Sequence, residues 1–197
     1  MTVEALAAWM LSIMLATVPP GHSRRPAEAK ETAEAGRTRY EAIATALARV
    51  ALDPTETPLF DGPDGRRRTA SLMLAIARYE STWRRDVDLG IGPRARGGGR
   101  YWCMMQIAVD RGHTPEGWTG KDLIKSRAKC FRRALHILQR GQRVCRRRSG
   151  SNAGSWGFLN HYASGHCNRG RKAVAKRIRT YNEWWREFPF EPERSPP

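Results

Sequence analysis

Residues 69–79 read TASLMLAIARY and carry apolar side chains on nearly every face of a helix. A helix that is apolar all round lies inside a domain, because it has no polar face to turn toward water. Thr69 has a side-chain oxygen that can accept a bond from a free N–H group of the first turn, so we expect it to be the N-cap. This run therefore predicts a central helix against which the rest of the chain packs.

Four further segments repeat apolar residues at helical spacing, which predicts amphipathic helices. They are Tyr40–Val50, ended by Asp53-Pro54; Phe131–Leu138, closed by Gly141; Trp156–Tyr162, stopped by Gly165; and Val174–Phe188. A signal for strands is confined to a possible short hairpin within residues 86–107. We therefore expect a mainly α fold.

A chain of 197 residues is long enough for one domain with flanking segments. We expect an apolar stretch and a charged linker in residues 1–37, the folded domain in residues 38–190 and a flexible tail in residues 191–197. The stretch Ala5–Val18 has the length of the core of an export signal, but it follows Glu4 and lacks a basic flank. A cleaved signal and a packed N-terminal helix both stay open. We expect no transmembrane anchor, because no segment is long enough to span a bilayer.

The formal net charge of +16 and the pI near 10.8 favour a polyanionic partner. Nucleic acid, anionic lipid and an acidic cell-wall polymer all fit this description. The basic clusters at residues 66–68, 146–148 and 169–172 either attract such a polymer or are solvated turns and helix ends. Charge alone does not choose among these partners.

Four cysteines stand at long spacings with no CxxC pair, which favours two disulfides over a tetrahedral metal site. We favour the pairs Cys103–Cys130 and Cys145–Cys167, because each would join neighbouring segments. Disulfides indicate an oxidising compartment. The alternative is four buried free thiols, since cysteine is often a small core residue. The histidines form no HExxH pair, so we expect no metal.

Glu80 directly follows the central helix and is flanked by Tyr79 and Trp83. A carboxyl group can donate a proton near neutral pH only where dry, apolar surroundings raise its pKa. We expect such surroundings for Glu80, at the floor of a cleft. The alternative is a glutamate at the surface, paired with Arg78 or Arg84, because most such carboxylates are solvated.

Three short motifs follow one another along the chain: Glu80-Ser81, the segment CMMQI at Cys103–Ile107 and the segment HYASG at His161–Gly165. In this order they resemble the soluble lytic transglycosylases, which are similar to goose-type lysozyme and share its lysozyme-like fold. The resemblance covers roughly residues 69–185. It implies a single lysozyme-like domain with an N-terminal helical extension.

The resemblance also implies roles for individual residues. Glu80 would be the general acid, Met105 and Gln106 would line the substrate groove, and Tyr162 would hydrogen-bond or orient Glu80. Ser81 of the first motif joins this expected substrate-binding set.

Trp102 is a further expected groove residue, because tryptophan stacks on sugar rings and this one lies beside the Met-Gln motif. The chain departs from the family pattern at four positions. Cys103 stands for a glycine, Met104 for a leucine, and Ala163 and Ser164 for the family's Asn and Ala. None of these departures changes the proton donor.

The implied reaction cleaves the bond between N-acetylmuramic acid and N-acetylglucosamine of peptidoglycan with a single carboxylate and no cofactor. Glu80 would first act as acid and then as base on the muramic C6 hydroxyl, which leaves a 1,6-anhydro end. A second carboxylate would instead favour hydrolysis by a muramidase, and Asp86 and Asp88 are the nearest candidates in sequence.

A basic, non-enzymatic nucleic-acid-binding protein is the alternative from another class. The cysteines argue against it, and no arginine-rich recognition helix or aromatic RNA-binding signature is present. We therefore expect peptidoglycan strands and no nucleic acid as the partner of a monomer that is extracytoplasmic or phage-associated.

Overall fold

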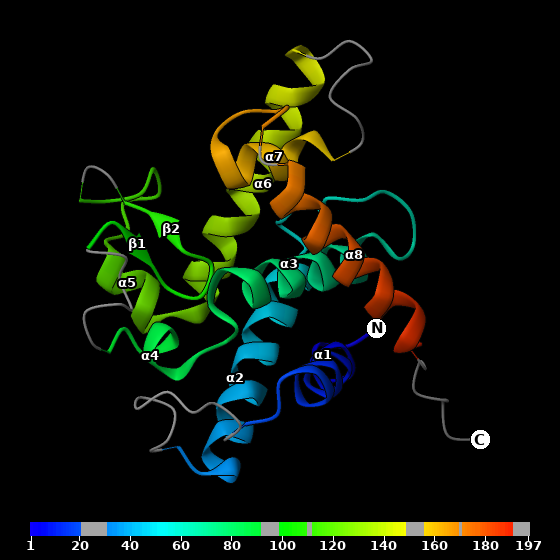
Figure 1. Ribbon diagram of the computed structural model, residues 1–197, viewed down its shortest axis with the longest axis vertical. Helices are drawn as coiled ribbons and strands as arrows, with labels where there is room; N and C mark the ends of the chain where they lie inside the picture. Colours follow the sequence, from blue (N-terminus) through cyan, green and yellow to red (C-terminus); the bar gives the residue numbers. More distant parts are fainter. Residues whose placement is uncertain (21–30, 92–98, 110–111, 149–155, 170, 191–197) are drawn as a thin grey trace.

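A computed structural model of the protein describes residues 1–20, 31–91, 99–109, 112–148, 156–169 and 171–190. Most of the expected linker and the expected tail, residues 191–197, lie outside these ranges. The described chain is mainly helical with one small antiparallel sheet (Figure 1), which confirms the predicted class and the presence of a short hairpin.

The elements follow one another in a simple order. The helices are α1 (Val3–Thr17), α2 (Ala33–Leu52), α3 (Gly65–Ser81), α4 (Arg85–Asp88), α5 (Gly120–Lys125), α6 (Arg127–Arg148), α7 (Gly157–Ser164) and α8 (Arg171–Glu187), and the strands are β1 (Tyr101–Trp102) and β2 (Ile107–Ala108). The strands pair with Tyr101 opposite Ala108 and Trp102 opposite Ile107.

Helix α3 crosses the middle of the molecule (Figure 1), and every residue from Thr69 to Ala77 is buried. It packs against α1, α2, α6 and α8. The expectation that Thr69 is the N-cap is wrong, because α3 begins one turn earlier at Gly65. The Thr69 hydroxyl instead donates to the Gly65 carbonyl at 2.8 Å and accepts from the Leu59 N–H at 2.8 Å, so it joins the preceding loop to the helix.

The N-terminal stretch is a packed helix in this structure. Leu6, Met10 and Ile13 of α1 are fully buried, and α1 lies along α2. The Trp9 indole N–H donates to the Phe188 carbonyl at 2.8 Å, which joins α1 to the end of α8. The expected domain boundary at residue 38 falls inside α2, so α1 and α2 belong to the same core as the rest. Within the described residues, no helix has both the length and the apolar character that a membrane span requires.

Helix α6 continues through Gly141 to Arg148, so the expected stop at Gly141 is wrong. A Cβ atom at position 141 would lie 3.1 Å from the Phe158 carbonyl oxygen, at the point where α7 crosses α6. The glycine therefore permits close packing of two helices rather than ending one of them. The stop expected at Gly165 is confirmed, because this residue caps α7 with a φ of 72°.

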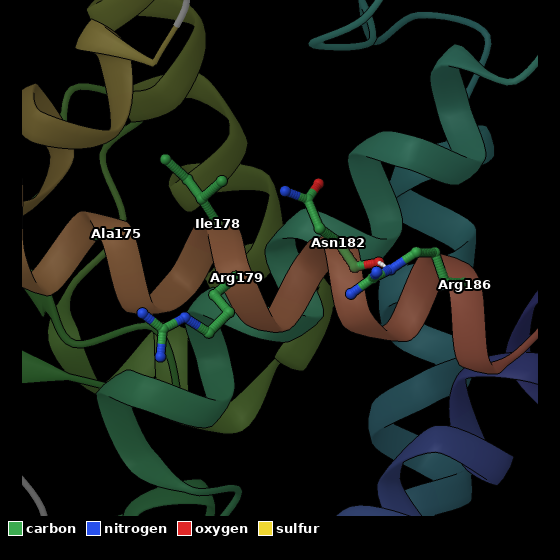
Figure 2. A pocket seen from close by; sticks show the side chains of 5 residues that line it. All are labelled: Ala175, Ile178, Arg179, Asn182 and Arg186. Carbon is green, nitrogen blue, oxygen red and sulfur yellow. Dashed lines mark hydrogen bonds between the residues drawn. The ribbon is translucent and has the colours of Figure 1, made fainter.

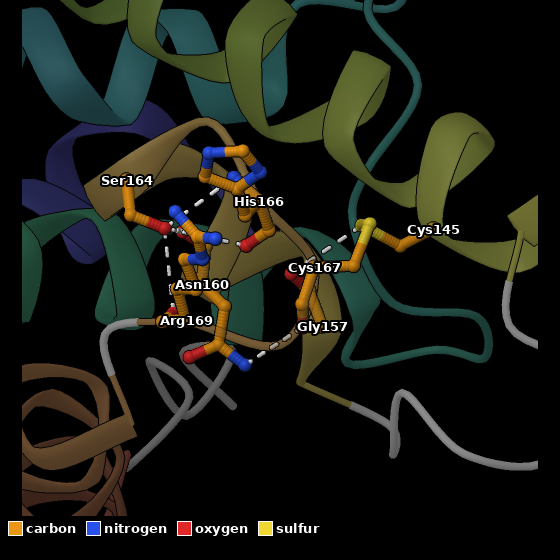
Figure 3. Close-up of a disulfide and its surroundings, with 7 residues drawn as sticks. All are labelled: Cys145, Gly157, Asn160, Ser164, His166, Cys167 and Arg169. Carbon is orange, nitrogen blue, oxygen red and sulfur yellow. Dashed lines mark hydrogen bonds between the residues drawn. A yellow bond between two sulfur atoms is a disulfide. The ribbon is translucent and has the colours of Figure 1, made fainter.

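Two disulfides join the described cysteines in the predicted pairing. Cys103 bonds Cys130 and ties the hairpin to α6. Cys145 bonds Cys167 and ties α6 to the turn after α7 (Figure 3). The Asn160 amide donates to the Cys167 carbonyl at 3.0 Å and holds the same turn. Both bonds therefore connect α6 to segments that carry candidate site residues.

Candidate active site

A cavity of about 640 Å³ opens where the end of α3, the hairpin, α6, α7 and α8 meet. We call it the groove. It is lined by Glu80, Tyr101, Gln106, Ile107, Ala108, Arg133, Ile137, Arg140, His161, Tyr162, Ala163, Gly165, Ala173 and Arg177. Of the residues expected from the sequence, Glu80, Gln106 and Tyr162 therefore meet in one cavity, although they come from three distant parts of the chain.

Glu80 lies in the last turn of α3, and its side chain is 20% exposed. The helix ends directly after it, because Thr82 and Trp83 adopt φ values of 53° and 51°. The Ser81 hydroxyl donates to the Ala77 carbonyl at 2.9 Å and accepts from the Trp83 N–H at 3.2 Å. Ser81 is thus buried in the helix end and lies outside the groove lining, in contrast to our expectation, and it closes the helix that presents Glu80.

The Glu80 carboxylate is paired with Arg177 of α8, with Arg177 Nη2 at 2.5 Å from Glu80 Oε1. The Arg177 side chain is only 10% exposed, and its guanidinium lies 5.7 Å from the centre of the Tyr79 ring. Glu80 therefore lines the groove with partial access to water, but a charged group contacts it in place of the apolar surroundings that we expected, and it is not a surface glutamate paired with Arg78 or Arg84. Its partner comes from a different helix that also lines the groove.

Arg177 is a site residue that the sequence analysis missed, although a signal was present. Position 177 lies on the core stripe of α8, three residues after Val174 and four before Tyr181, and both of these are buried. A long charged side chain on a buried stripe requires a charged or hydrogen-bonding partner. The sequence could thus have indicated a buried ion pair, but it could not have identified Glu80 as the partner.

The Tyr162 hydroxyl donates to the backbone carbonyl of Met105 at 2.6 Å. The expected hydrogen bond from Tyr162 to Glu80 is therefore replaced by one to the hairpin. Burial raises the pKa of the Tyr162 phenol well above its usual value of 10.0, and the charge of Glu80 raises it further, while Arg177 lowers it. Tyr162 thus stays a hydrogen-bond donor that joins α7 to the hairpin. It lies close enough to Glu80 for the carboxylate charge to affect its pKa.

Met105 does not line the groove as expected, because its side chain is fully buried in the core. Its contribution is the carbonyl that accepts from Tyr162. Gln106 does line the groove, and its side-chain amide donates to the Cys103 carbonyl at 3.1 Å. That bond fixes the Gln106 side chain at the tip of the hairpin.

The hairpin turn needs two residues in the left-handed region, where side chains other than glycine are uncommon. Cys103 has a φ of 56° and Gln106 a φ of 48°. Position 103 is the one at which the resembled family has glycine, the residue best suited to this conformation. The disulfide to Cys130 anchors the turn here instead.

Trp102 lies outside the groove lining, so the place that we expected for it in the groove is wrong. Neighbouring residues of a strand point to opposite faces of the sheet. Tyr101 therefore turns toward the groove, whereas the Trp102 ring packs on α5, where a Cβ atom at Gly120 would lie 2.0 Å from it. The aromatic side chain available to a ligand at this edge is that of Tyr101, which is 46% exposed.

Neither Asp86 nor Asp88 reaches the groove. Both lie in the short helix α4 rather than in a loop or strand. Asp88 is paired with Arg127 at 2.6 Å and its side chain is 1% exposed, while Asp86 is paired with Arg84 at 2.8 Å. Among the described residues that line the groove, Glu80 is the single carboxyl side chain.

On the α6 side of the groove, charged side chains contact one another in sequence, beginning with Arg133. We call them the charged row. Arg133 lines the groove and pairs with Glu116 at 3.2 Å, and Glu116 also meets His136 Nδ1 at 2.8 Å. The other ring nitrogen of His136 lies 3.2 Å from Glu56. Burial alone would raise the pKa of Glu116, but the bond from His136, further hydrogen bonds and the charge of Arg133 lower it from 4.5 to about 2.

No group of three or more His, Cys, Asp or Glu side chains in the described parts of the chain could hold a metal ion. Comparisons with protein-family models, with curated proteins and with solved structures find no match to this chain. Its function must therefore be inferred from the groove and the side chains that line it.

Proposed function

We propose that this protein is a lytic transglycosylase with a lysozyme-like domain, and that it cleaves the glycan strands of peptidoglycan in the groove. The observation that carries the proposal is the meeting of Glu80, Gln106 and Tyr162 in one cavity. Each comes from a different one of the three motifs that resemble this family. Their meeting in one cavity supports the proposal.

The groove contains what this chemistry needs. Glu80 donates a proton to the glycosidic oxygen while the acetamido group of the substrate stabilises the cationic carbon. The carboxylate then takes a proton from the C6 hydroxyl, whose oxygen closes the 1,6-anhydro ring, and Glu80 is protonated again. The cycle needs neither water nor a second carboxylate, which agrees with the single carboxyl side chain among the described lining residues.

Arg177 affects the two halves of this cycle in opposite ways. A guanidinium bonded to a carboxylate pairs with its ionised form, so the contact supports Glu80 as a base. The same contact has to loosen when Glu80 acts as an acid. Arg177 is therefore a positioning residue, which holds the carboxylate against the wall of the groove between the two proton transfers.

The two disulfides of the described chain support an extracytoplasmic or phage-associated location. Both disulfides are typical of proteins that work in an oxidising environment. Peptidoglycan lies in such an environment. The location is thus consistent with the proposed substrate.

The test is the clearing of a suspension of purified cell-wall sacculi by the wild type and by Glu80→Gln. We expect Glu80→Gln to clear at least about 100-fold more slowly, because positioned acid–base groups contribute factors of this size. Asp86→Asn is the matched control and should clear normally, since its carboxylate lies outside the groove. Mass spectrometry of the products should show 1,6-anhydro ends.

Other results would contradict the proposal. Reducing ends would identify a hydrolytic muramidase on the same site. Equal clearing by the wild type and Glu80→Gln would remove Glu80 from the mechanism. Failure of the wild type to clear sacculi, together with tight, salt-sensitive DNA binding, would support the nucleic-acid-binding alternative.

A further inference from the structure

The excess positive charge of this protein lies in one segment. Residues 123–182 contain 16 basic residues (Lys and Arg) and no acidic residue (Asp or Glu). The rest of the chain contains 19 basic and 19 acidic residues. This segment forms α6, α7 and most of α8. These three helices supply one wall of the groove, and α3 and the hairpin supply the other. We call the first the basic wall.

Four arginines of the basic wall are already paired with carboxylates from other parts of the fold. These are Arg127 with Asp88, Arg132 with Asp53, Arg133 with Glu116 and Arg177 with Glu80. The exposed cations that the structure describes within residues 127–182 have no carboxylate partner among the described residues. They are Arg140, Arg143, Arg146, Arg147, Arg169, Lys172, Lys176 and Arg179.

The positive surface extends beyond the groove. Figure 2 shows the outer face of α8, where Arg179 and Arg186 project from the same helix beside Asn182. The Arg186 Nε donates to the Asn182 carbonyl of its own helix at 3.3 Å, so its charge is not neutralised by that contact. This face of α8 points away from Ala173 and Arg177, which line the groove, so it is a separate positive surface.

Arg140 is the cation of this set that lines the groove itself. It lies on α6 two turns after Arg133 and beyond Ile137, which also lines the groove. Arg133 is held by Glu116 and Arg177 by Glu80, so their charges are largely balanced. The charge of Arg140 is left for a ligand.

We propose that the basic wall binds carboxylate groups carried by the glycan substrate, and that Arg140 is the residue that contacts them next to the reacting bond. This inference rests on the proposed function and adds the substrate feature that is recognised. Arg140 and Glu80 line one cavity, so the anion must belong to a molecule that also presents its cleavable bond to Glu80. A glycan with carboxylate-bearing peptide substituents meets both conditions, whereas a separate phosphodiester polymer would compete with the substrate for the groove.

The experiment compares two forms of the same sacculi, one native and one with its carboxylates converted to neutral amides. The wild type should clear the native form about fivefold faster, because one partly solvated ion pair contributes about 1 kcal/mol. Arg140→Gln should lose this preference by slowing on native sacculi alone. Arg49→Gln is the matched control, since it removes the same charge from an exposed position on α2, outside the basic wall and the groove, and it should keep the preference.

Each other outcome has a distinct meaning. If the wild type clears neither form, the proposed function itself fails. If it clears both at the same rate, the glycan is cut but its carboxylates are not recognised, and this inference is wrong. The inference is also wrong if Arg140→Gln slows the clearing of both forms equally. It is wrong again if the Arg140→Gln variant binds DNA more weakly at fixed salt but keeps the preference for native sacculi.

Discussion

Replacing Glu116 by Gln should show how much the charged row behind the groove contributes to stability. Glu116 holds Arg133 at the groove and meets His136, and its pKa is lowered from 4.5 to about 2. A pKa difference of this size between the folded and unfolded states corresponds to a contribution of at most about 3.4 kcal/mol to the free energy of unfolding. The Glu116 side chain is 20% exposed, and solvent screens part of this energy. We therefore expect Glu116→Gln to lower the free energy of unfolding by about 1–2 kcal/mol at pH 7.

The pH dependence follows from the direction of the pKa change. Because the pKa of Glu116 is lower in the folded state, its contribution is fully present above about pH 4.5 and is lost as the pH falls toward 2. The difference between wild type and Glu116→Gln in urea unfolding, followed by tryptophan fluorescence, should therefore shrink between pH 5 and pH 2.5.

The matched control is Glu41→Gln, which breaks an ion pair with Arg37 in which the Glu41 side chain is 48% exposed. It should change the free energy of unfolding by less than about 0.5 kcal/mol at any pH. A Glu116→Gln difference that is the same at pH 7 and pH 2.5 would refute the reasoning, because it could not come from the ionised carboxylate.

Two further predictions concern the groove. Tyr162→Phe removes the donor to the Met105 carbonyl and should lower the free energy of unfolding by about 1–2 kcal/mol; an unchanged urea midpoint would show that this bond is not important. The double replacement of Cys103 and Cys130 by Ser opens a link across 27 positions and should cost about 3–4 kcal/mol. Reductant opens both disulfides of the wild type, so the reduced protein should lose at least this much stability, and equal stability of reduced and oxidised protein would contradict the prediction.

Patterns within single segments predicted α2, α3, α6, α7 and α8 and favoured the two disulfides, whereas α1 was left open and the short helices α4 and α5 were not predicted. The apolar run at residues 69–79 became the buried α3, and the turn expected at Gly165 is present. The pairing of four cysteines was also predicted, since neighbouring segments of a helical domain tend to lie together. The errors at helix ends came from residue types that also occur inside helices, where they serve packing or hydrogen bonding. Gly141 lies within α6 and permits close packing of α7 against it. Thr69 lies within α3 and joins the preceding loop to that helix.

The candidate site was only partly predictable. The resemblance of three motifs to a known family implied Glu80, Gln106 and Tyr162 as site residues, and these three do line one groove. Trp102 and Ser81 were wrongly expected there. Their side-chain directions depend on strand pairing and on the helix end, and neither can be read from the motif itself.

The sequence by itself determined α2, α3, α6, α7 and α8 and where the positive charge lies, because these depend on residues close together in the chain, and it favoured the cysteine pairing that the structure has. Only the tertiary structure decided that Arg177 meets Glu80 and that Tyr162 donates to Met105. Those contacts join residues from different helices and the hairpin. Their partners are selected by the packing of α8 and α7 against the groove, and no spacing along the chain encodes that geometry.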